Sequence, residues 1–316
     1  MRLRWRNRRP AAVSVIFALV LTACGGGGSG GIVPPIANPP PPPSPPPVNV
    51  NINDPALTRI DNTPVTAGAP STLVWSDEFD AERLDPATWF FETGDGSQYG
   101  IPGWGNNEAQ WYQPDSAELK DGLLVITARE ARAGGKQYTS ARINTKDRVA
   151  VRYGRIESRI RLPGGQGLWP AFWLLPQDNT YGTWAASGEI DIVEGVNLGA
   201  AGGNTIYGTL YFGGESPDIE SSSVQYQVPT DTTAEFHVYA VEWDETEMRW
   251  YVDDMLYAVQ NAWSTASADF PAPFDQSFYI LLNVAVGGNF PGPPDAATVF
   301  PVMMEVDYVR VYSGEP

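Results

Sequence analysis

The stretch Ser187-Gly188-Glu189-Ile190-Asp191-Ile192-Val193-Glu194-Gly195 constrains the fold of this chain more than any other, because it sets three carboxylates among β-branched residues. A strand places alternate side chains on one face, so Glu189 and Asp191 share a face and the two isoleucines share the other. Strict alternation would point Glu194 into the apolar layer, where an unpaired carboxylate is costly. A one-residue bulge resets the alternation. The pattern therefore predicts a bulged strand with three carboxyl groups on one face.

Three adjacent carboxyl groups cannot all ionise freely, so at least one pKa is expected to rise. A carboxylate beside a carboxylic acid, about 5–5.5 Å apart, is what retaining glycoside hydrolysis requires. The alternative is the solvated polar face of an edge strand. Ile190, Ile192 and Val193 are not typical of edge strands, which favours a buried strand and a catalytic interpretation.

Composition narrows the class of protein. The chain has 316 residues and is 42% hydrophobic, which is enough for one sizeable core. Its net charge of −17 argues against a nucleic-acid partner. An excess of acidic residues is also explained by solubility alone. The one cysteine excludes a disulfide framework, and no Cys/His cluster is available for zinc. The one histidine, His237, lies in a strand-like run and is expected to be structural.

The N-terminal sequence predicts a targeting segment followed by a spacer, and neither is expected to belong to a folded domain. Residues 1–23 combine a basic start with a short apolar run, as in a signal peptide, and end in Leu21-Thr22-Ala23-Cys24, which is similar to a bacterial lipobox. This predicts a lipoprotein with lipid on Cys24. The alternative is an ordinary secretion signal with an incidental cysteine. Residues 24–70 are then a Gly/Pro-rich tether, partly disordered, whose proline run reaches roughly 40 Å.

This arrangement predicts an extracytoplasmic protein attached to a bacterial membrane. Gly25, rather than Asp, follows the lipidated cysteine. By analogy with Gram-negative sorting, that favours the outer membrane if the organism is Gram-negative.

Residues 71–316 read as one all-β domain. Short apolar runs separated by turn residues predict an antiparallel β-sandwich or jelly roll, and no convincing helical periodicity or repeat occurs. Asp121-Gly122 and Asp253-Asp254 are predicted tight turns. The predicted strands cover 73–75, 123–128, 153–162, 168–175, 188–194, 205–212, 236–243, 248–252, 256–259, 278–284 and 303–312.

Residues 72–313 resemble glycoside hydrolase family 16, specifically its bacterial endo-1,3-β-glucanases (laminarinases). The stretches that carry the resemblance are Trp75-Ser76-Asp77-Glu78-Phe79, Trp104-Gly105-Asn106-Asn107-Glu108, Gly167-Leu168-Trp169-Pro170-Ala171-Phe172-Trp173, Gly188 to Glu194, Asn283-Val284-Ala285-Val286-Gly287-Gly288 and Val306-Asp307-Tyr308-Val309-Arg310-Val311-Tyr312. The resemblance implies a concanavalin A-like β-jelly roll with a concave substrate cleft, and chemistry that requires no cofactor.

The resemblance also implies catalytic roles. Glu189 matches the nucleophile, Glu194 the general acid/base, and Asp191 a residue that tunes their protonation. The bulged spacing Glu-x-Asp-x-x-Glu resembles laminarinases, agarases and carrageenases, whereas lichenases and xyloglucan enzymes have Glu-x-Asp-x-Glu.

Several side chains are candidates for sugar binding. Trp169 and Trp173 lie on one face of a predicted strand, where indoles can stack on sugar rings, and Phe172 and Leu174 already supply the core from the other face. Core tryptophans are the alternative. Trp184, Arg142 and Asn107 match sugar-binding positions of the family. A solvated arginine and a turn asparagine are the alternatives for the last two.

Two further points follow from the resemblance. Many laminarinases have a cleft histidine where this chain has Tyr211, which leaves substrate preference open. Glu78, Gly122 and Asp307 match positions that hold a structural Ca²⁺ through oxygen ligands. The alternative for Asp307 is a structural hydrogen bond.

The predicted substrate is β-1,3-glucan, hydrolysed by a monomeric endo-acting enzyme. One alternative is a hydrolase of agar, carrageenan or mixed-linkage glucan with the same fold. The acidic net charge of the chain favours a neutral glucan over a sulfated polysaccharide as substrate. Another alternative is a non-catalytic glycan-binding surface protein, which the presence of all three carboxylates disfavours.

Overall fold

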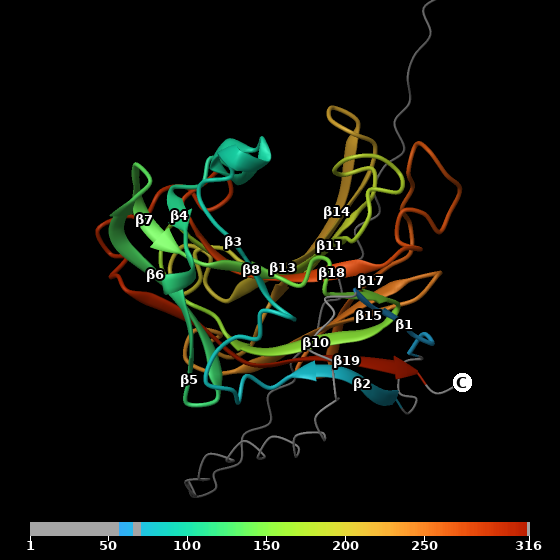
Figure 1. Ribbon diagram of the computed structural model, residues 1–316, viewed down its shortest axis with the longest axis horizontal. Coiled ribbons are helices and arrows are strands. Elements are labelled where there is room, and N and C mark those ends of the chain that lie inside the picture. Colours follow the sequence, from blue (N-terminus) through green and yellow to red (C-terminus); the bar gives the residue numbers. More distant parts are fainter. Residues whose placement is uncertain (1–56, 66–70, 315–316) are drawn as a thin grey trace, which may run out of the picture. The chain divides into compact units, whose positions relative to one another are not determined.

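The computed structural model describes residues 57–65 and 71–314, which form two stacked β-sheets (Figure 1). The inner sheet has the strand order β1-β9-β18-β11-β12-β13-β14, with β3 and β8 at its side. Its strands are β1 (Thr58–Asp61), β3 (Phe90–Glu92), β8 (Arg142–Asn144), β9 (Val149–Arg152), β11 (Leu168–Pro176), β12 (Glu189–Gly195), β13 (Thr205–Gly213), β14 (Ile219–Gln227) and β18 (Phe278–Val286).

The outer sheet has the order β17-β16-β15-β10-β19-β6-β7-β4, with β2 and β5 at its side. Its strands are β2 (Ser71–Asp77), β4 (Gln110–Tyr112), β5 (Ala117–Lys120), β6 (Leu123–Ala133), β7 (Lys136–Ser140), β10 (Gly154–Arg161), β15 (His237–Trp243), β16 (Met248–Val252), β17 (Met255–Gln260) and β19 (Val302–Gly314). The helical segments of the described residues are short 3₁₀ turns: η1 (Ser97–Tyr99), η2 (Pro102–Gly105) and η3 (Pro114–Ser116).

This architecture confirms the predicted all-β sandwich. The strand pairings are antiparallel except for β1 with β9 and β4 with β7, which are parallel. Both exceptions place a short strand at the end of a sheet, reached by a long connection instead of a hairpin. Within the described ranges no helix is long and apolar enough to cross a membrane.

The core lies between the two sheets and follows strand alternation. Phe172 and Leu174 of β11 are fully buried, as the sequence predicts, and they meet Trp243 and Trp250 of the outer sheet in one apolar cluster. Each such burial contributes about 1.5–3 kcal/mol of hydrophobic stabilisation.

Both predicted tight turns join neighbouring strands. Asp121-Gly122 connects β5 to β6, and Asp253-Asp254 connects β16 to β17. All four residues have positive φ, as two-residue hairpin loops of the primed type require. His237 is buried on β15, with Nδ1 2.6 Å from Asp253 Oδ2, so its contacts are those of a structural residue.

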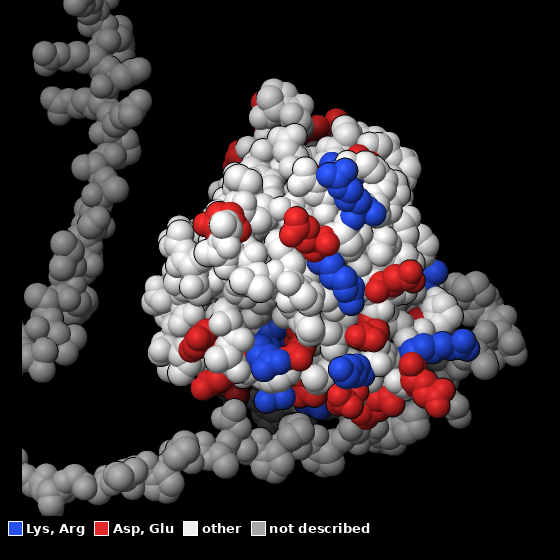
Figure 2. Space-filling model, turned by 90° about the vertical axis from the view of Figure 1, so that its left-hand side faces the viewer, with Lys and Arg blue, Asp and Glu red and all other residues white. Residues whose placement is uncertain are grey.

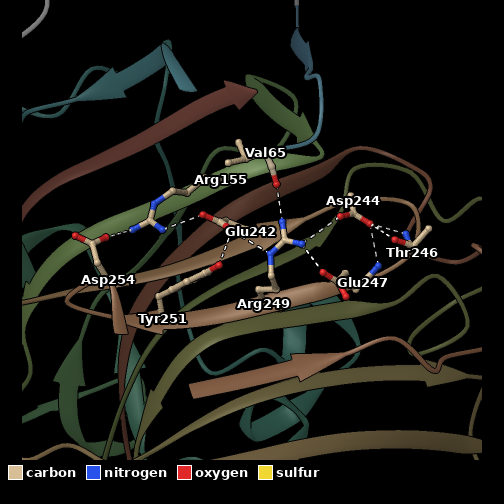
Figure 3. A network of polar contacts seen from close by, with 9 residues as sticks. All are labelled: Val65, Arg155, Glu242, Asp244, Thr246, Glu247, Arg249, Tyr251 and Asp254. Atoms are coloured by element: carbon tan, nitrogen blue, oxygen red, sulfur yellow. Dashed lines mark hydrogen bonds and ion pairs between the residues drawn. The ribbon is translucent and has the colours of Figure 1, made fainter. Parts of the chain in front are cut away.

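Residues 57–65 fall within the predicted tether but belong to the sandwich. They add β1 to the inner sheet, and Gly314 at the end of β19 donates a hydrogen bond to Thr63 O at 2.8 Å. Val65 is 3% exposed, and its carbonyl accepts a bond from Arg249 Nη2 at 2.5 Å. Figure 3 shows this contact at the edge of an ion-pair network on the outer sheet, in which Glu242 lies between Arg249 and Arg155. The predicted signal peptide, Cys24 and the rest of the tether lie outside the described residues.

Charged side chains on the face that carries β6 and β7 are mixed in sign. Figure 2 shows lysines and arginines lying beside aspartates and glutamates there. This face does not present the extended positive field that a nucleic-acid backbone selects.

Candidate active site

A cavity of about 410 Å³ lies over the inner sheet. The adjacent strands β11 and β12 line its floor with Trp169, Ala171 and Trp173, and with Glu189, Asp191 and Glu194. The remaining lining residues come from η2 and the residues that flank it, from β8 and the loop after it, from β13 and β18, and from the end of β11 and the loop after it.

The strand β12 carries the predicted bulge. On β11, Phe172 pairs with Val193 and Trp173 pairs with Asp191, so Ile192 has no partner. On β13, the pairing shifts at the same place. The extra residue keeps Ile190, Ile192 and Val193 in the core, with at most 1% exposure, while all three carboxyl groups face the cavity.

The three carboxyl groups interact strongly. Burial raises the pKa of Asp191 well above its ordinary value, and the charges of Glu194 and Glu189 raise it further. Burial likewise raises the pKa of Glu189 to about 8 and that of Glu194 to about 7. Asp191 Oδ2 is buried without a hydrogen-bond partner among the described residues. Burial beside two other carboxyl groups therefore favours the protonated form of Asp191.

Two indoles fix the outer carboxyl groups. Trp184 Nε1 donates to Glu189 Oε2 at 2.7 Å, and Trp169 Nε1 donates to Glu194 Oε1 at 2.9 Å. Both hydrogen bonds favour the ionised carboxylate and oppose the effect of burial. The two tryptophans were predicted as stacking residues, and the structure adds the role of orienting donors.

Arg142 lines the cavity but is not solvated. It is 8% exposed, forms an ion pair with Glu92, and lies 4.6 Å from the ring centre of Trp104 and 4.7 Å from that of Trp173. The guanidinium is thus held between two indoles at one end of the cavity.

Asn107 lies outside this cavity. Its side chain is exposed and donates to Asn289 Oδ1 at 2.9 Å, in a neighbouring hollow. Asn106 lines the cavity instead. The positive φ of Asn107, 58°, redirects the chain between the two residues.

Asn283 and Glu108 are among the cavity residues that were not assigned a role from the sequence. Trp173 Nε1 donates to Asn283 Oδ1 at 2.7 Å, and Asn283 continues through Tyr112 to the buried carboxylate of Glu108. Tyr211 pairs with Glu189 across β13, where many laminarinases have histidine. Glu108 and Asn283 occur in the quoted motifs, but only the strand register brings them to the cavity.

Comparison with known proteins agrees with this geometry. The sequence profile of glycosyl hydrolases family 16 matches residues 105–309. The chain belongs to this family. Glucan endo-1,3-beta-glucosidase A1 of Niallia circulans is 41% identical over 291 residues, covering 84% of this chain but only 42% of that enzyme. Beta-glucanase of Rhodothermus marinus is 41% identical over 254 residues, covering 76% of this chain and 84% of the relative.

A solved structure supports the same assignment. The laminarinase catalytic domain from Thermotoga maritima MSB8 superposes with a TM-score of 0.70 at 39% identity, covering 78% of this chain and 99% of the other. The fold predicted for a family 16 hydrolase is therefore confirmed.

The three residues predicted to hold calcium lie in the same part of the outer sheet. Asp77 pairs with Val309 and Leu124 pairs with Val306, so Glu78 and Gly122 flank the part of β19 that contains Asp307. The Glu78 carboxylate is paired with Arg310 at 2.7 Å, and that of Asp307 with Arg159 at 2.7 Å. No group of three or more acidic, His or Cys side chains placed to hold a metal occurs in residues 57–65 and 71–314.

Proposed function

We propose that this family 16 hydrolase cleaves internal bonds of β-1,3-glucan with retention of configuration at the anomeric carbon. The observation that carries the proposal is the bulged strand β12, which turns Glu189, Asp191 and Glu194 into one cavity. The names of the Niallia and Thermotoga relatives, an endo-1,3-glucosidase and a laminarinase, support this choice of substrate.

Two glutamates divide the chemistry. Glu189 attacks the anomeric carbon while Glu194 protonates the leaving oxygen, and a glycosyl ester forms on Glu189. Glu194, now ionised, takes a proton from the water that opens this ester. With its pKa near 7, Glu194 can serve both steps at neutral pH. A protonated Asp191 that donated a hydrogen bond to Glu189 would favour the ionised nucleophile.

Replacing the nucleophile tests the proposal. We expect Glu189→Gln to lower turnover of laminarin by at least about 10³-fold. The protein should stay folded, because glutamine preserves volume and still accepts the Trp184 hydrogen bond. Glu118→Gln, at an exposed glutamate on β5, is the matched control. Wild-type turnover in Glu189→Gln would refute the assignment.

Other substrates of this fold are the alternative within the same class. This chain has Tyr211 where many laminarinases have histidine. Because of this difference, mixed-linkage glucan, agar and carrageenan are the alternative substrates. A reducing-sugar assay across these polysaccharides decides between them. Binding of laminarin without any product on long incubation would instead support a non-catalytic glycan-binding protein.

The location of the protein is a separate proposal. The basic start, the apolar run and the sequence Leu21-Thr22-Ala23-Cys24 support a lipid anchor on Cys24 and an extracytoplasmic site, in the outer membrane if the organism is Gram-negative. Labelled palmitate should enter the wild-type protein and not Cys24→Ser. Equal labelling of both would exclude the anchor.

A structural Ca²⁺ is the last proposal drawn from the resemblance. The convergence of Glu78, Gly122 and Asp307 supports it, with backbone carbonyls of the first two and the Asp307 carboxylate as oxygen ligands. The arginine partners of both carboxylates weigh against a tight site. Adding Ca²⁺ to chelator-treated protein should raise Tm in the wild type and not in Asp307→Asn. An unchanged wild-type Tm would exclude the site.

A further inference from the structure

A buried polar network ends at Trp173 and takes no part in the chemistry above. It consists of Glu108, Gln110, Tyr112 and Asn283, and each of these side chains is at most 6% exposed. Tyr112 is fully buried and does not line the cavity, so it cannot contact a sugar there. Any effect of its hydroxyl on sugar binding must therefore pass through other residues.

The hydrogen bonds of this network have one consistent direction. Trp173 Nε1 can only donate, and it lies 2.7 Å from Asn283 Oδ1. The amide nitrogen of Asn283 is then left to donate to the hydroxyl oxygen of Tyr112, at 3.3 Å. Because this oxygen accepts the bond, its own proton is free for Glu108 Oε2, which lies 3.1 Å away. The asparagine amide is therefore oriented by the groups at its two ends.

The Glu108 end of the network is fixed by the backbone of β18. Gln110 Nε2 also donates to Glu108 Oε2, at 2.6 Å, while Gln110 Oε1 accepts from Val286 N at 2.8 Å. A backbone N–H cannot become an acceptor, so the glutamine amide has one orientation and its nitrogen must face the carboxyl group. Glu108 Oε2 is thereby kept as an acceptor, toward which the hydroxyl of Tyr112 can direct its proton.

Trp173 is the end of this network that a sugar can reach. Its indole is partly exposed and lines the cavity, with the Arg142 guanidinium 4.7 Å from the ring centre. Stacking of an indole on a ligand depends on the orientation of the ring. A ring that is held before the ligand arrives also loses less conformational entropy on binding. The hydrogen bond to Asn283 supplies that restraint.

We propose that Tyr112 is a positioning residue, which holds the Asn283 amide in the orientation that fixes Trp173 for sugar binding. This inference rests on the proposed function. Without the tyrosine hydroxyl, the amide can turn over and present its nitrogen to Trp173 Nε1. Two donors would then face each other, and the indole would lose its partner.

The first test needs no ligand. In isotope-labelled protein the Trp173 Nε1–H signal is identified by its loss in Trp173→Phe, and its exchange with solvent is followed by NMR. We expect Tyr112→Phe, which keeps the ring and removes only the hydroxyl, to speed this exchange about tenfold. Tyr239→Phe is the matched control, because Tyr239 is also fully buried and its hydroxyl has no hydrogen-bond partner among the described residues. It should leave the exchange unchanged.

The second test measures binding of the β-1,3-linked hexasaccharide of glucose in the Glu189→Gln background, where the ligand is expected to survive the titration. Calorimetry should give a Kd about fivefold higher with Tyr112→Phe, as the loss of one neutral hydrogen bond implies, and an unchanged Kd with Tyr239→Phe. When Trp173→Phe is already present, Tyr112→Phe should change Kd by less than about twofold, because the residue through which it acts has lost its N–H. With Glu189 in place, KM for laminarin should rise about fivefold while kcat stays within about twofold.

Unchanged exchange of the Trp173 N–H in Tyr112→Phe would overturn the proposal, and so would faster exchange with an unchanged Kd. An equal rise of Kd with and without the Trp173 indole would also overturn it, because Tyr112 would then act on the fold as a whole. Faster exchange in a protein that binds no hexasaccharide would support the positioning of Trp173 and refute the choice of glucan alone, since the exchange is measured without ligand.

Discussion

Asp191 is the most buried of the three carboxyl groups, at 2% exposure, and it lies between the two glutamates that carry the proposed chemistry. Its neighbours and its burial both favour the protonated form. A neutral aspartic acid in this position can donate a hydrogen bond to Glu189, which an ionised one cannot. A neutral Asp191 therefore offers a hydrogen-bond donor to the proposed nucleophile, and it adds no third charge to the cavity.

The raised pKa of Asp191 predicts a pH-dependent effect on stability. The folded protein retains this proton at pH values where the unfolded chain has lost it, so stability falls as pH rises above the unfolded pKa of about 3.9. Asp191→Asn removes that loss. We expect the Tm advantage of Asp191→Asn over wild type to be larger at pH 8 than at pH 5 by about 3 °C or more. Calorimetry at both pH values checks this, and an equal advantage at the two would contradict a protonated Asp191.

The role of Glu194 predicts a rescue experiment. Glu194→Ala should lower laminarin turnover about 10²–10⁴-fold, because no acid remains for the leaving oxygen. A diglucosyl fluoride needs no such proton, so the variant should still form the ester on Glu189. Azide, which attacks without a base, should then restore turnover of the fluoride donor and yield a glycosyl azide of β configuration. Absence of rescue, or an α product, would place the acid/base elsewhere.

Sequence reasoning found the residues whose chemistry is unusual in a strand and missed those whose position depends on pairing. Three acids among β-branched residues have few explanations, so Glu189, Asp191 and Glu194 could be recognised directly. Nothing local distinguishes Asn106 from Asn107, and the left-handed turn at Asn107 decided which of them faces the cavity. The family resemblance placed Tyr211 in the cleft, but only the pairing of β13 with β12 shows that it lies across from Glu189.

At the scale of elements, the bulge in β12 shifts the pairing of this strand with its neighbours by one residue. Without it, the spacing between Asp191 and Glu194 would bury a carboxylate against the core. With it, Ile192 and Val193 both stay buried and Glu194 returns to the cavity face. One additional residue therefore keeps the apolar side chains of β12 in the core and all three carboxyl groups on the cavity face.

This account predicts opposite results for two single-residue deletions in β12. Removing Ile192 takes away the extra residue and leaves Glu189, Asp191 and Glu194 on one face by plain alternation. We expect a folded protein, destabilised by about 2–5 kcal/mol for the lost buried side chain, with measurable laminarin turnover. Removing Ile190 breaks the alternation of Glu189 with Asp191 and should abolish turnover. Thermal unfolding and reducing-sugar assays compare the two, and equal activity would contradict the bulge as described.

The strands that the sequence predicted are those with long apolar or alternating runs, such as β11, β13 and β18. Those it missed are short or polar. β14 reads Ile-Glu-Ser-Ser-Ser-Val-Gln-Tyr-Gln and lies at the free end of the inner sheet, where one face has little to pack against. β1, β3 and β8 have three or four residues and owe their strand geometry to the neighbour they pair with. Tertiary pairing, rather than local propensity, made these strands.

At the scale of the whole molecule, residues 57–65 close the two sheets against each other. β1 pairs with β9 of the inner sheet, while Thr63 and Val65 contact β19 and β16 of the outer sheet. A polar segment that precedes the first apolar strand gives no sequence signal for this role.

Truncation tests the contribution of that segment. A chain that begins at residue 66 loses the buried Val65 and leaves Arg249 without its carbonyl partner, whereas one that begins at residue 57 keeps both. We expect the shorter chain to be less stable by about 2–4 kcal/mol. Its laminarin turnover at low temperature should be unchanged, since the segment does not line the cavity. Urea unfolding measures the difference, and equal midpoints would show that the segment is dispensable.

The last strand of the described residues, β19, is also a central one, with β10 on one side and β6 and β2 on the other. The outer sheet therefore lacks its middle until β19 has joined it. The sandwich cannot be completed without residues 302–314, because β10, β6 and β2 all pair with β19.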